Sequence, residues 1–225
     1  MSGLPARRVL RYAHRGAWSR QPGGPRENTL AAFAAAAGAW DGVELDVHRT
    51  ADGRLPVVHD RLLGERPVGT QSWDELRAAA PWVPELHEAL RLCRDAGLRV
   101  NLEIKAGSDF YPGIEAQVLT AIQRHGWAEA TVVSSFDQVA LLRVRELDSR
   151  ITTAVLYAGR VLDPVGVARR CGATGLHPEW QLLRAEDVAV MRNAGMWVAT
   201  WTARGPETTS RLGALGVDAV IGDPA

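Results

Sequence analysis

The residues best suited to chemistry begin in the segment 42–60, where acids and an imidazole alternate with apolar residues. Alternate side chains of a β-strand point to opposite faces. Glu44, Asp46 and His48 therefore share one face of the predicted strand, and the apolar residues between them share the other. Carboxylates on an otherwise apolar strand are costly to bury without a partner. The pattern predicts that cationic groups meet Glu44 and Asp46.

A tight turn after this strand is expected to bring a second imidazole to the same place. The pair Asp52-Gly53 is a strong signal for a two-residue hairpin loop. With such a loop Ala51 pairs with Arg54, and counting outward sets Asp46 opposite His59. Directly opposed residues share a face of the sheet. The predicted hairpin thus gathers carboxylates and an imidazole around one point.

Further polar residues fall at the ends of other predicted strands. His14 and Arg15 end the first strand, and Glu103 and Lys105 share a face of the third. Glu103 and the two acids above form an oxygen-rich set that suits a hard cation such as Mg²⁺ or Ca²⁺. Zinc is less favoured, since no cysteine cluster or His-Glu-x-x-His motif is present. A buried ion-pair network, with Arg15 and Lys105 neutralising the acids, is the alternative without a metal.

Two histidines beside a cation and two fixed positive charges suit phosphate-ester chemistry. Imidazoles exchange protons near neutral pH, which fits His14 and His59 for acid and base roles. Fixed cations stabilise the charge that develops on phosphate oxygens, which fits Arg15 and Lys105. The residue types therefore point to phosphate-ester chemistry.

The rest of the chain predicts a parallel sheet that brings these strand ends together. A helix, a glycine and an apolar strand recur in that order at Gly97, Gly126, Gly172, Gly195 and Gly216. Eight predicted strands separated by helices indicate an α/β fold, a single (β/α)₈ barrel of the TIM type. We expect one domain over residues 1–225, with a short insertion at 62–83 after the second strand and no eighth helix after the last one.

Chemistry in such barrels sits at the carboxyl ends of the strands, where the polar residues above fall. A doubly wound open sheet is the competing fold. No G-x-G-x-x-G motif follows the first strand, which disfavours dinucleotide binding.

The composition disfavours several other classes of protein. The chain has 225 residues, 46% of them hydrophobic, which suits one domain with a substantial core. Lys plus Arg and Asp plus Glu both number 26, so no gross field attracts nucleic acid or an anionic membrane. Residues 1–8 lack an apolar targeting segment, and no later run approaches membrane-spanning length. We expect a cytoplasmic protein without stable membrane anchoring, and homo-oligomerisation stays open.

Short motifs spread along the chain carry a family resemblance. They are His14-Arg15-Gly16, Glu27-Asn28-Thr29, Glu44-Leu45-Asp46-Val47, Thr50-Ala51-Asp52-Gly53, Val57-Val58-His59-Asp60, Glu103-Ile104-Lys105, Trp201-Thr202 and the segment 216–224. In this order they resemble the glycerophosphodiester phosphodiesterase family over essentially the whole chain.

The resemblance implies a (β/α)₈ barrel that uses a divalent cation to cleave glycerophosphodiesters, such as glycerophosphocholine or glycerophosphoethanolamine. The products are an alcohol and glycerol 3-phosphate. By resemblance Glu44, Asp46 and Glu103 are the metal ligands, and His14 and His59 are the acid–base pair. In the family mechanism the glycerol 2-hydroxyl attacks phosphorus, and water then opens the cyclic phosphate.

The same resemblance implies a set of substrate-binding residues. Arg15 and Lys105 would hold phosphate oxygens. Trp201 is expected to wall the glycerol side of the site, with packing in the core as the alternative. Glu27 is expected to orient Arg15 or His14 rather than bind metal.

The chain departs from the family pattern at several positions. Arg26 replaces the proline expected before the Glu-Asn-Thr motif, and we expect it to face solvent. Only 43 residues separate His59 from Glu103, which predicts a small insertion and an open mouth. Arg204 stands where the family has asparagine. The role of His177, at the end of the sixth strand, stays open.

Two alternatives to the leading function remain. A lysophospholipase D-like phosphodiesterase would act on lysophospholipids and need an exposed apolar rim for the acyl chain. A barrel that binds a phosphodiester without turnover is the alternative outside enzymes, but the intact histidines and acids argue against it.

Overall fold

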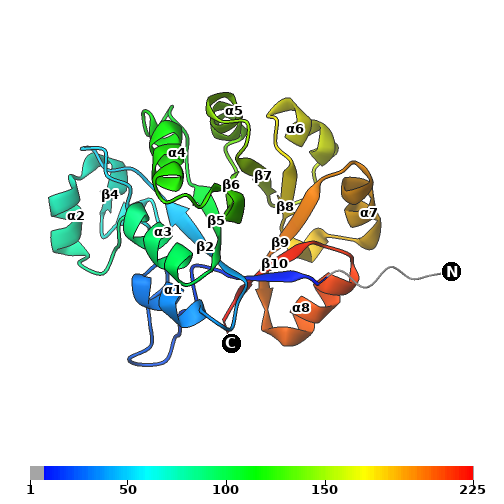
Figure 1. Cartoon of the computed structure of the whole chain (residues 1–225), viewed down its shortest axis with the longest axis horizontal. Coiled ribbons are helices and arrows are strands. Elements are labelled where there is room, and N and C mark those ends of the chain that lie inside the picture. Colours follow the sequence, from blue (N-terminus) through cyan, green and yellow to red (C-terminus); the bar gives the residue numbers. More distant parts are fainter. Residues whose placement is uncertain (1–7, 225) are drawn as a thin grey trace.

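Parallel strands close into a barrel in the computed structural model, which describes residues 8–224 (Figure 1). In order around the barrel the strands are β1 (Leu10–Ala13), β10 (Ala219–Asp223), β9 (Trp197–Arg204), β8 (Gly175–Pro178), β7 (Thr152–Tyr157), β6 (Thr131–Ser135), β5 (Arg99–Ile104) and β2 (Gly42–Val47). Pairing of β2 with β1 completes the closure. The predicted (β/α)₈ barrel is confirmed, and the open sheet is excluded.

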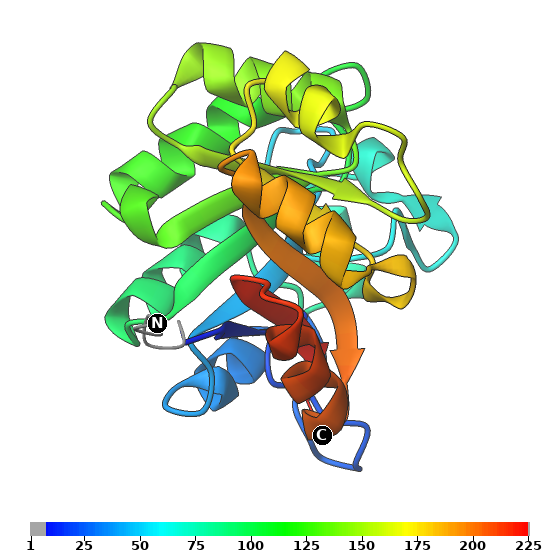
Figure 2. The same cartoon turned by 90° about the vertical axis from the view of Figure 1, so that its right-hand side faces the viewer.

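Helices fill the connections between successive barrel strands and form a ring outside them (Figure 1). They are α1 (Leu30–Ala36), α3 (Leu86–Asp95), α4 (Ile114–Arg124), α5 (Gln138–Leu147), α6 (Pro164–Arg170), α7 (Ala185–Asn193) and α8 (Gly205–Ala214). Figure 2 shows β9, the long orange strand, beside α7 and α8. Within residues 8–224 β10 is the last element.

The helices begin where the sequence offers side chains for their free amides. Thr29 caps α1 by accepting from the Ala32 amide, and Asp137 caps α5. Asp163 caps α6, with Pro164 in the first helical position. These caps fix where each helix leaves the barrel and therefore the length of the loop that follows each strand.

Alternation along the strands divides the barrel into an apolar exterior and a mixed interior. Val43, Leu45 and Val47 belong to the main hydrophobic core between β2 and the helices. A smaller interior cluster contains Tyr12, and Gly42 faces its ring. A Cβ on Gly42 would lie 2.7 Å from that ring, so this position requires glycine. The opposite face of β2 is left for polar residues at the mouth.

The segment after β2 contains elements outside the barrel. They are β3 (Leu62–Leu63), β4 (Arg66–Pro67), the 3₁₀ turn η1 (Val68–Thr70) and α2 (Trp73–Ala79). Val68, Leu76, Ala80 and Val83 form a separate small hydrophobic cluster. In Figure 1 α2 and β4 protrude at one side of the barrel. This segment coincides with the insertion expected at 62–83.

The predicted two-residue hairpin loop is wrong by one residue. The Thr50 amide donates to the Arg54 carbonyl over 2.9 Å, and Val47 bridges Val57, so three residues form the turn. Gly53 closes it with φ of +87°, the left-handed conformation that such turns require. Asp46 consequently lies opposite Val58 rather than opposite His59. The Val58 amide donates to the Asp46 carbonyl over 3.0 Å.

The structure also describes the two cysteines and the lengths of the helices. Cys93 and Cys171 are both free and buried, and burial raises the pKa of the Cys93 thiol to about 12. None of the helices in residues 8–224 has the length and apolar character needed to cross a bilayer. Most of the N-terminal segment predicted to lack a targeting signal, residues 1–7, lies outside the described residues.

Candidate active site

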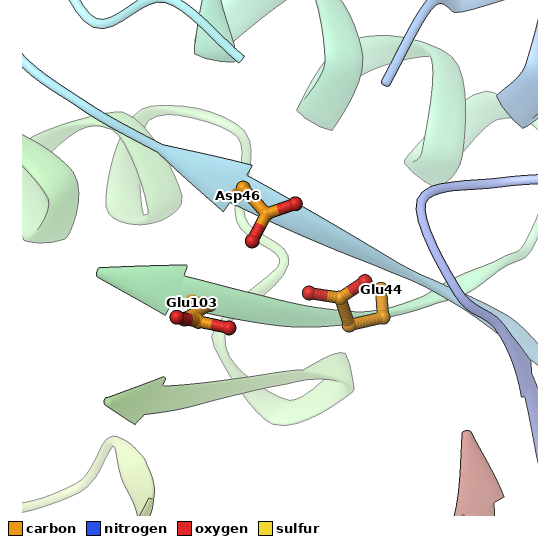
Figure 3. A group of neighbouring side chains, drawn as sticks. All are labelled: Glu44, Asp46 and Glu103. Atoms are coloured by element: carbon orange, nitrogen blue, oxygen red, sulfur yellow. The ribbon is translucent and has the colours of Figure 1, made fainter. Parts of the chain in front are cut away.

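Three buried carboxylates converge at the carboxyl ends of β2 and β5. Glu44 and Asp46 lie on β2, and the strand register pairs Asp46 with Glu103 on β5. One carboxylate oxygen of each lies within 4.8 Å of the others. Figure 3 shows the three side chains on the same side of the two neighbouring strands. The donor set is all oxygen, which fits a hard divalent cation.

Two fixed cations lie beside the acids. The Lys105 ammonium is 2.8 Å from Glu103 and 3.3 Å from Asp46. The Arg15 Nε atom is 3.6 Å from Asp46, and its terminal nitrogen contacts Glu27 at 2.9 Å. Glu27 therefore orients Arg15, as expected from the sequence.

The acids differ in how readily they ionise. Burial, followed by the nearby Asp46 and Glu103 carboxylates, raises the pKa of Glu44 well above its ordinary value. Burial and Asp46 also raise the pKa of Glu103 to about 7, although Lys105 opposes this. Burial alone would raise the pKa of Asp46, but Lys105 and Arg15 hold it below its ordinary value. A cation between the three would favour the charged forms of Glu44 and Glu103.

His14 is held in one orientation by an acid from the last strand. Its Nδ1 atom lies 2.7 Å from a carboxylate oxygen of Asp223, at the end of β10. A carboxylate only accepts, so Nδ1 carries the proton and Nε2 faces Glu44 at 4.0 Å. The ring is thus presented with its unprotonated nitrogen toward the acids.

His59 has a similar arrangement nearer to solvent. Its Nδ1 atom is 2.7 Å from Asp60, whose side chain is 77% exposed. By the same reasoning the proton lies on Nδ1, and Nε2 is left for exchange with a substrate. His14 and His59 line one cavity with Asp46, although the hairpin register that set His59 directly opposite Asp46 was wrong.

The backbone near the acids adopts an uncommon conformation at two positions. Arg15 and Asn28 have φ of 59° and 54°, in the left-handed region. The Arg15 amide donates to Glu44 over 3.0 Å, and the Asn28 side-chain amide donates to Asp46 over 2.8 Å. Such residues cost roughly 1–3 kcal/mol and persist where contacts hold them. Here they orient two of the three carboxylates.

The opposite wall of the cavity is apolar. Trp201, Phe136 and Leu156 line it together with Ile221. The Trp201 indole N–H donates to the His177 carbonyl over 2.7 Å, and its ring meets Phe136 edge-on at 5.6 Å. Trp201 therefore forms part of the wall of the cavity rather than only core.

The structure brings most of the predicted site residues to this cavity. The predicted residues that line it are His14, Arg15, Glu44, Asp46, His59, Glu103, Lys105 and Trp201. Glu27 reaches it through Arg15. Arg26 is exposed, as expected, with its guanidinium 4.3 Å from the centre of the Trp82 ring.

His177 has no part in the cavity. The ring is fully buried, and burial lowers its pKa to about 3, so it is neutral. Neither ring nitrogen has a hydrogen-bond partner among residues 8–224. The histidine packs at 5.3 Å from the Trp197 ring, which is a core contact.

The sequence interpretation missed the side chains that orient the others. Asp223 holds His14, Asp60 holds His59 and Asn28 holds Asp46. A signal was available for Asp60 and Asp223, since both are acids inside the motifs that carry the family resemblance.

Comparisons with known proteins agree with this site. The model of the Glycerophosphoryl diester phosphodiesterase family matches residues 14–225. A glycerophosphodiester phosphodiesterase of Caldanaerobacter subterraneus is 33% identical over 96% of this chain and 94% of its own length. One from Bacillus altitudinis is 30% identical over 94% of this chain and 93% of its own.

Solved structures give the same picture. A phosphodiesterase of Oleispira antarctica, in complex with the product sn-glycerol-3-phosphate, superposes with a TM-score of 0.85 at 25% identity, over 95% of this chain and 92% of that one. A glycerophosphodiester phosphodiesterase of Thermotoga maritima gives a TM-score of 0.76 at 27% identity, over 96% of this chain and 95% of that one. The relatives are named as enzymes, which argues against a barrel that only binds. The chain belongs to the glycerophosphoryl diester phosphodiesterase family.

Proposed function

We propose that this glycerophosphodiester phosphodiesterase uses a divalent cation, Mg²⁺ or Ca²⁺, held by Glu44, Asp46 and Glu103, and releases glycerol 3-phosphate and an alcohol. The product in the Oleispira antarctica structure supports glycerol 3-phosphate as the product here. Glycerophosphocholine and glycerophosphoethanolamine are the substrates that we propose to test first.

The charge balance of the cavity is the observation that carries the proposal. Three carboxylates and two fixed cations line it, so with all three acids ionised and neutral histidines the cavity carries one net negative charge. A phosphodiester is itself an anion, so this cavity would repel it. A divalent cation reverses the sign of the cavity and relieves the repulsion among the acids. An ion-pair network alone, with Lys105 and Arg15 as the only cations, leaves the excess charge in place.

The fixed cations are placed to receive the phosphate. Lys105 and Arg15 flank Asp46 from two directions, at 3.3 and 3.6 Å. Their charges remain fixed through the reaction and stabilise negative charge on the phosphate oxygens. When bound, the cation adds further charge stabilisation at those oxygens.

The two histidines carry the protons. His14 and His59 each present Nε2 to the cavity while an aspartate holds Nδ1. One takes the proton of the attacking hydroxyl, and the other gives a proton to the departing alcohol. This division needs one imidazole on each side of the phosphate. His14 directly follows β1, and His59 lies in the loop after β2.

The decisive experiment is a screen of glycerophosphodiesters with added Mg²⁺ or Ca²⁺ and with EDTA. We expect glycerol 3-phosphate from at least one substrate, and none after EDTA treatment. Full turnover in EDTA would overturn the metal assignment but leave the family assignment intact.

The ligand assignment has its own test. We expect Glu44→Gln to raise the cation concentration needed for half-maximal turnover by at least about tenfold, roughly 1.4 kcal/mol of binding free energy. The matched control is Glu129→Gln, at an exposed position away from the cavity. An unchanged cation requirement in Glu44→Gln would count against this ligand.

A second candidate substrate class is favoured by the loops around the mouth. Phe110, Phe136, Leu162 and Leu182 follow β5, β6, β7 and β8, and all four are exposed. Phe136 also lines the cavity, so this rim begins at the active site. Exposed apolar side chains on neighbouring loops are suited to an acyl chain. The rim therefore supports a lysophospholipase D-like activity on lysophospholipids.

The two substrate classes can be separated with one pair of variants. We expect Leu162→Ser to lower turnover of lysophosphatidylcholine, while turnover of glycerophosphocholine stays the same. Leu147→Ser is the control, because Leu147 is also exposed but lies at the end of α5 away from the mouth. Equal effects on both substrates would remove the acyl-chain role of the rim.

A further inference from the structure

A buried histidine lies behind the active site without lining it. His48 follows β2 and is 2% exposed, whereas the cavity is lined by other residues. Its ring packs edge-on against Tyr111, with ring centres 5.5 Å apart at 85°. Tyr111 comes from the loop after β5 and contacts Gly69 of the segment after β2. His48 therefore sits where three loops meet.

Both nitrogens of this ring are used. Nε2 lies 3.1 Å from the backbone carbonyl of His59, and Nδ1 lies 2.7 Å from the Tyr111 hydroxyl. A carbonyl only accepts, so Nε2 carries the proton and donates it to His59. In the neutral imidazole Nδ1 is then an acceptor, and the Tyr111 hydroxyl donates to it. The Tyr111 hydroxyl thus holds the ring in the orientation from which Nε2 donates to the His59 carbonyl.

His59 needs such support more than His14 does. The ring of His14 is held by Asp223, whose side chain is 13% exposed, while Asp60 beside His59 is 77% exposed. Within residues 8–224 the bond from His48 is the only hydrogen bond on the His59 backbone. Within the segment 58–61, the backbone hydrogen bonds to other described residues are those of the Val58 amide, the His59 carbonyl and the Arg61 carbonyl.

We propose that His48 is a positioning residue that holds the backbone of His59 so that its imidazole meets the reacting oxygen. The inference rests on the proposed acid–base role of His59. It does not require His48 to touch the substrate, and the geometry gives Tyr111 the task of holding His48. Removing either group lets the loop that carries His59 shift, and small shifts of a catalytic group cost up to about 100-fold in rate.

The experiment measures kcat and KM for glycerophosphocholine with added Mg²⁺. We expect His48→Ala to lower kcat by about 10- to 100-fold with KM nearly unchanged. His48→Gln should recover much of the loss, because the amide N–H can donate to the same carbonyl. Tyr111→Phe should show a smaller loss. Tyr157→Phe is the matched control and should leave kcat unchanged, since within residues 8–224 the hydrogen bond of the Tyr157 hydroxyl goes to the Met191 sulfur, at 3.9 Å.

A double-mutant cycle decides between positioning and general stability. Once His59→Ala has removed the imidazole, His48→Ala should lower kcat by little more, because both act on one step. Multiplying losses, or no rescue by His48→Gln, would overturn the inference. If His48→Ala does not fold, the cycle is run with Tyr111→Phe. Full activity in His59→Ala alone would instead overturn the proposed role of His59, so the two failures are distinguishable.

Discussion

The two halves of the barrel mouth differ in chemistry. On β1, β2 and β5 the cavity is lined by acids, fixed cations and His14. On β6, β7 and β9 it is lined by Phe136, Leu156 and Trp201. A phosphodiester has the same asymmetry, since the phosphate is charged and the ester groups on either side are not. The charged half is therefore the place for phosphate and cation, and the apolar half for one of the attached groups.

The histidines of the two halves show why proton transfer belongs to one side. In the charged half His14 has an acid on Nδ1, which sets its tautomer. In the apolar half His177 has no such partner, and burial lowers its pKa to about 3. A histidine that stays neutral throughout the working pH range cannot act as an acid. The same residue type thus has a catalytic setting in one half and a packing role in the other.

The largest effect should come from removing an imidazole of the charged half. We expect His59→Ala to lower turnover of glycerophosphocholine by about 10²- to 10⁴-fold, the usual size of an acid–base contribution. The melting temperature should stay close to that of the parent protein, because the His59 ring is partly exposed. Steady-state turnover and thermal unfolding are the two measurements.

The control for this variant is His87→Ala, at an exposed histidine on α3. It should retain parental turnover. A similar loss in both variants would mean that histidine removal acts through the fold and not through the site.

The next effect concerns pH and the acids. The pKa of Glu103 is raised from 4.5 to about 7. In the pH window between these values the folded protein holds a proton that the unfolded chain has released. The metal-free protein therefore loses stability as pH rises through the window. Cation binding needs the carboxylate, so its stabilising effect grows over the same range. We expect Mg²⁺ to raise the melting temperature more near pH 8 than near pH 5.5. The difference should be about 2–4 °C for each kcal/mol by which the binding free energy of Mg²⁺ is more favourable at the higher pH.

Asp46 has the opposite sign and does not obscure this test. Its pKa is lowered, so its contribution to stability is lost only as pH falls below its ordinary value of 3.8. Glu103→Gln is the informative variant, because it should reduce the pH dependence of the Mg²⁺ effect to the part that comes from the raised pKa of Glu44. Equal Mg²⁺ effects at both pH values in the parent protein would contradict the assignment of Glu103 as a ligand.

A smaller effect is expected in the apolar half. Trp201→Leu should raise KM for glycerophosphocholine by about fivefold, the equivalent of ~1 kcal/mol of lost aromatic contact. The cation concentration for half-maximal turnover should not change, since Trp201 lies on the wall opposite the acids. Trp127→Leu is the matched control, because the Trp127 indole also donates to a backbone carbonyl, that of Leu98 at 2.9 Å. A change in cation requirement in Trp201→Leu would remove the separation between the halves.

The barrel and the charged half could be predicted because both follow from local rules. Alternation along the strand put Glu44 and Asp46 on one face, and parallel pairing of neighbouring strands put Asp46 beside Glu103. Glycines at the ends of helices marked where each strand begins. These features depend on spacing within a few residues and on the closure of the sheet.

The parts that could not be predicted depend on packing between distant segments. The predicted length of the turn after β2 was wrong. Three residues, 51–53, lie between the paired Thr50 and Arg54, and the Asp-Gly pair does not distinguish a three-residue loop from a two-residue one. The contacts of Asp223 with His14 and of Asn28 with Asp46 join residues 209 and 18 positions apart. No periodicity in the sequence encodes such contacts, since closure of the barrel creates them.

The smallest effect is expected where this chain departs from its family. Arg204 is the position at which the family resemblance leads us to expect asparagine. Its Nε atom donates to Asp223 over 3.1 Å, while Asp223 holds His14 with its other oxygen. The Arg204 side chain is 77% exposed, and such surface pairs contribute about 0–1 kcal/mol. Arg204→Ala should therefore lower kcat by less than about fivefold. Asp223→Asn should cost far more, because the amide can present its N–H₂ to Nδ1 and reverse the tautomer of His14. Equal losses in the two variants would show that Arg204, and not Asp223 alone, orients this histidine.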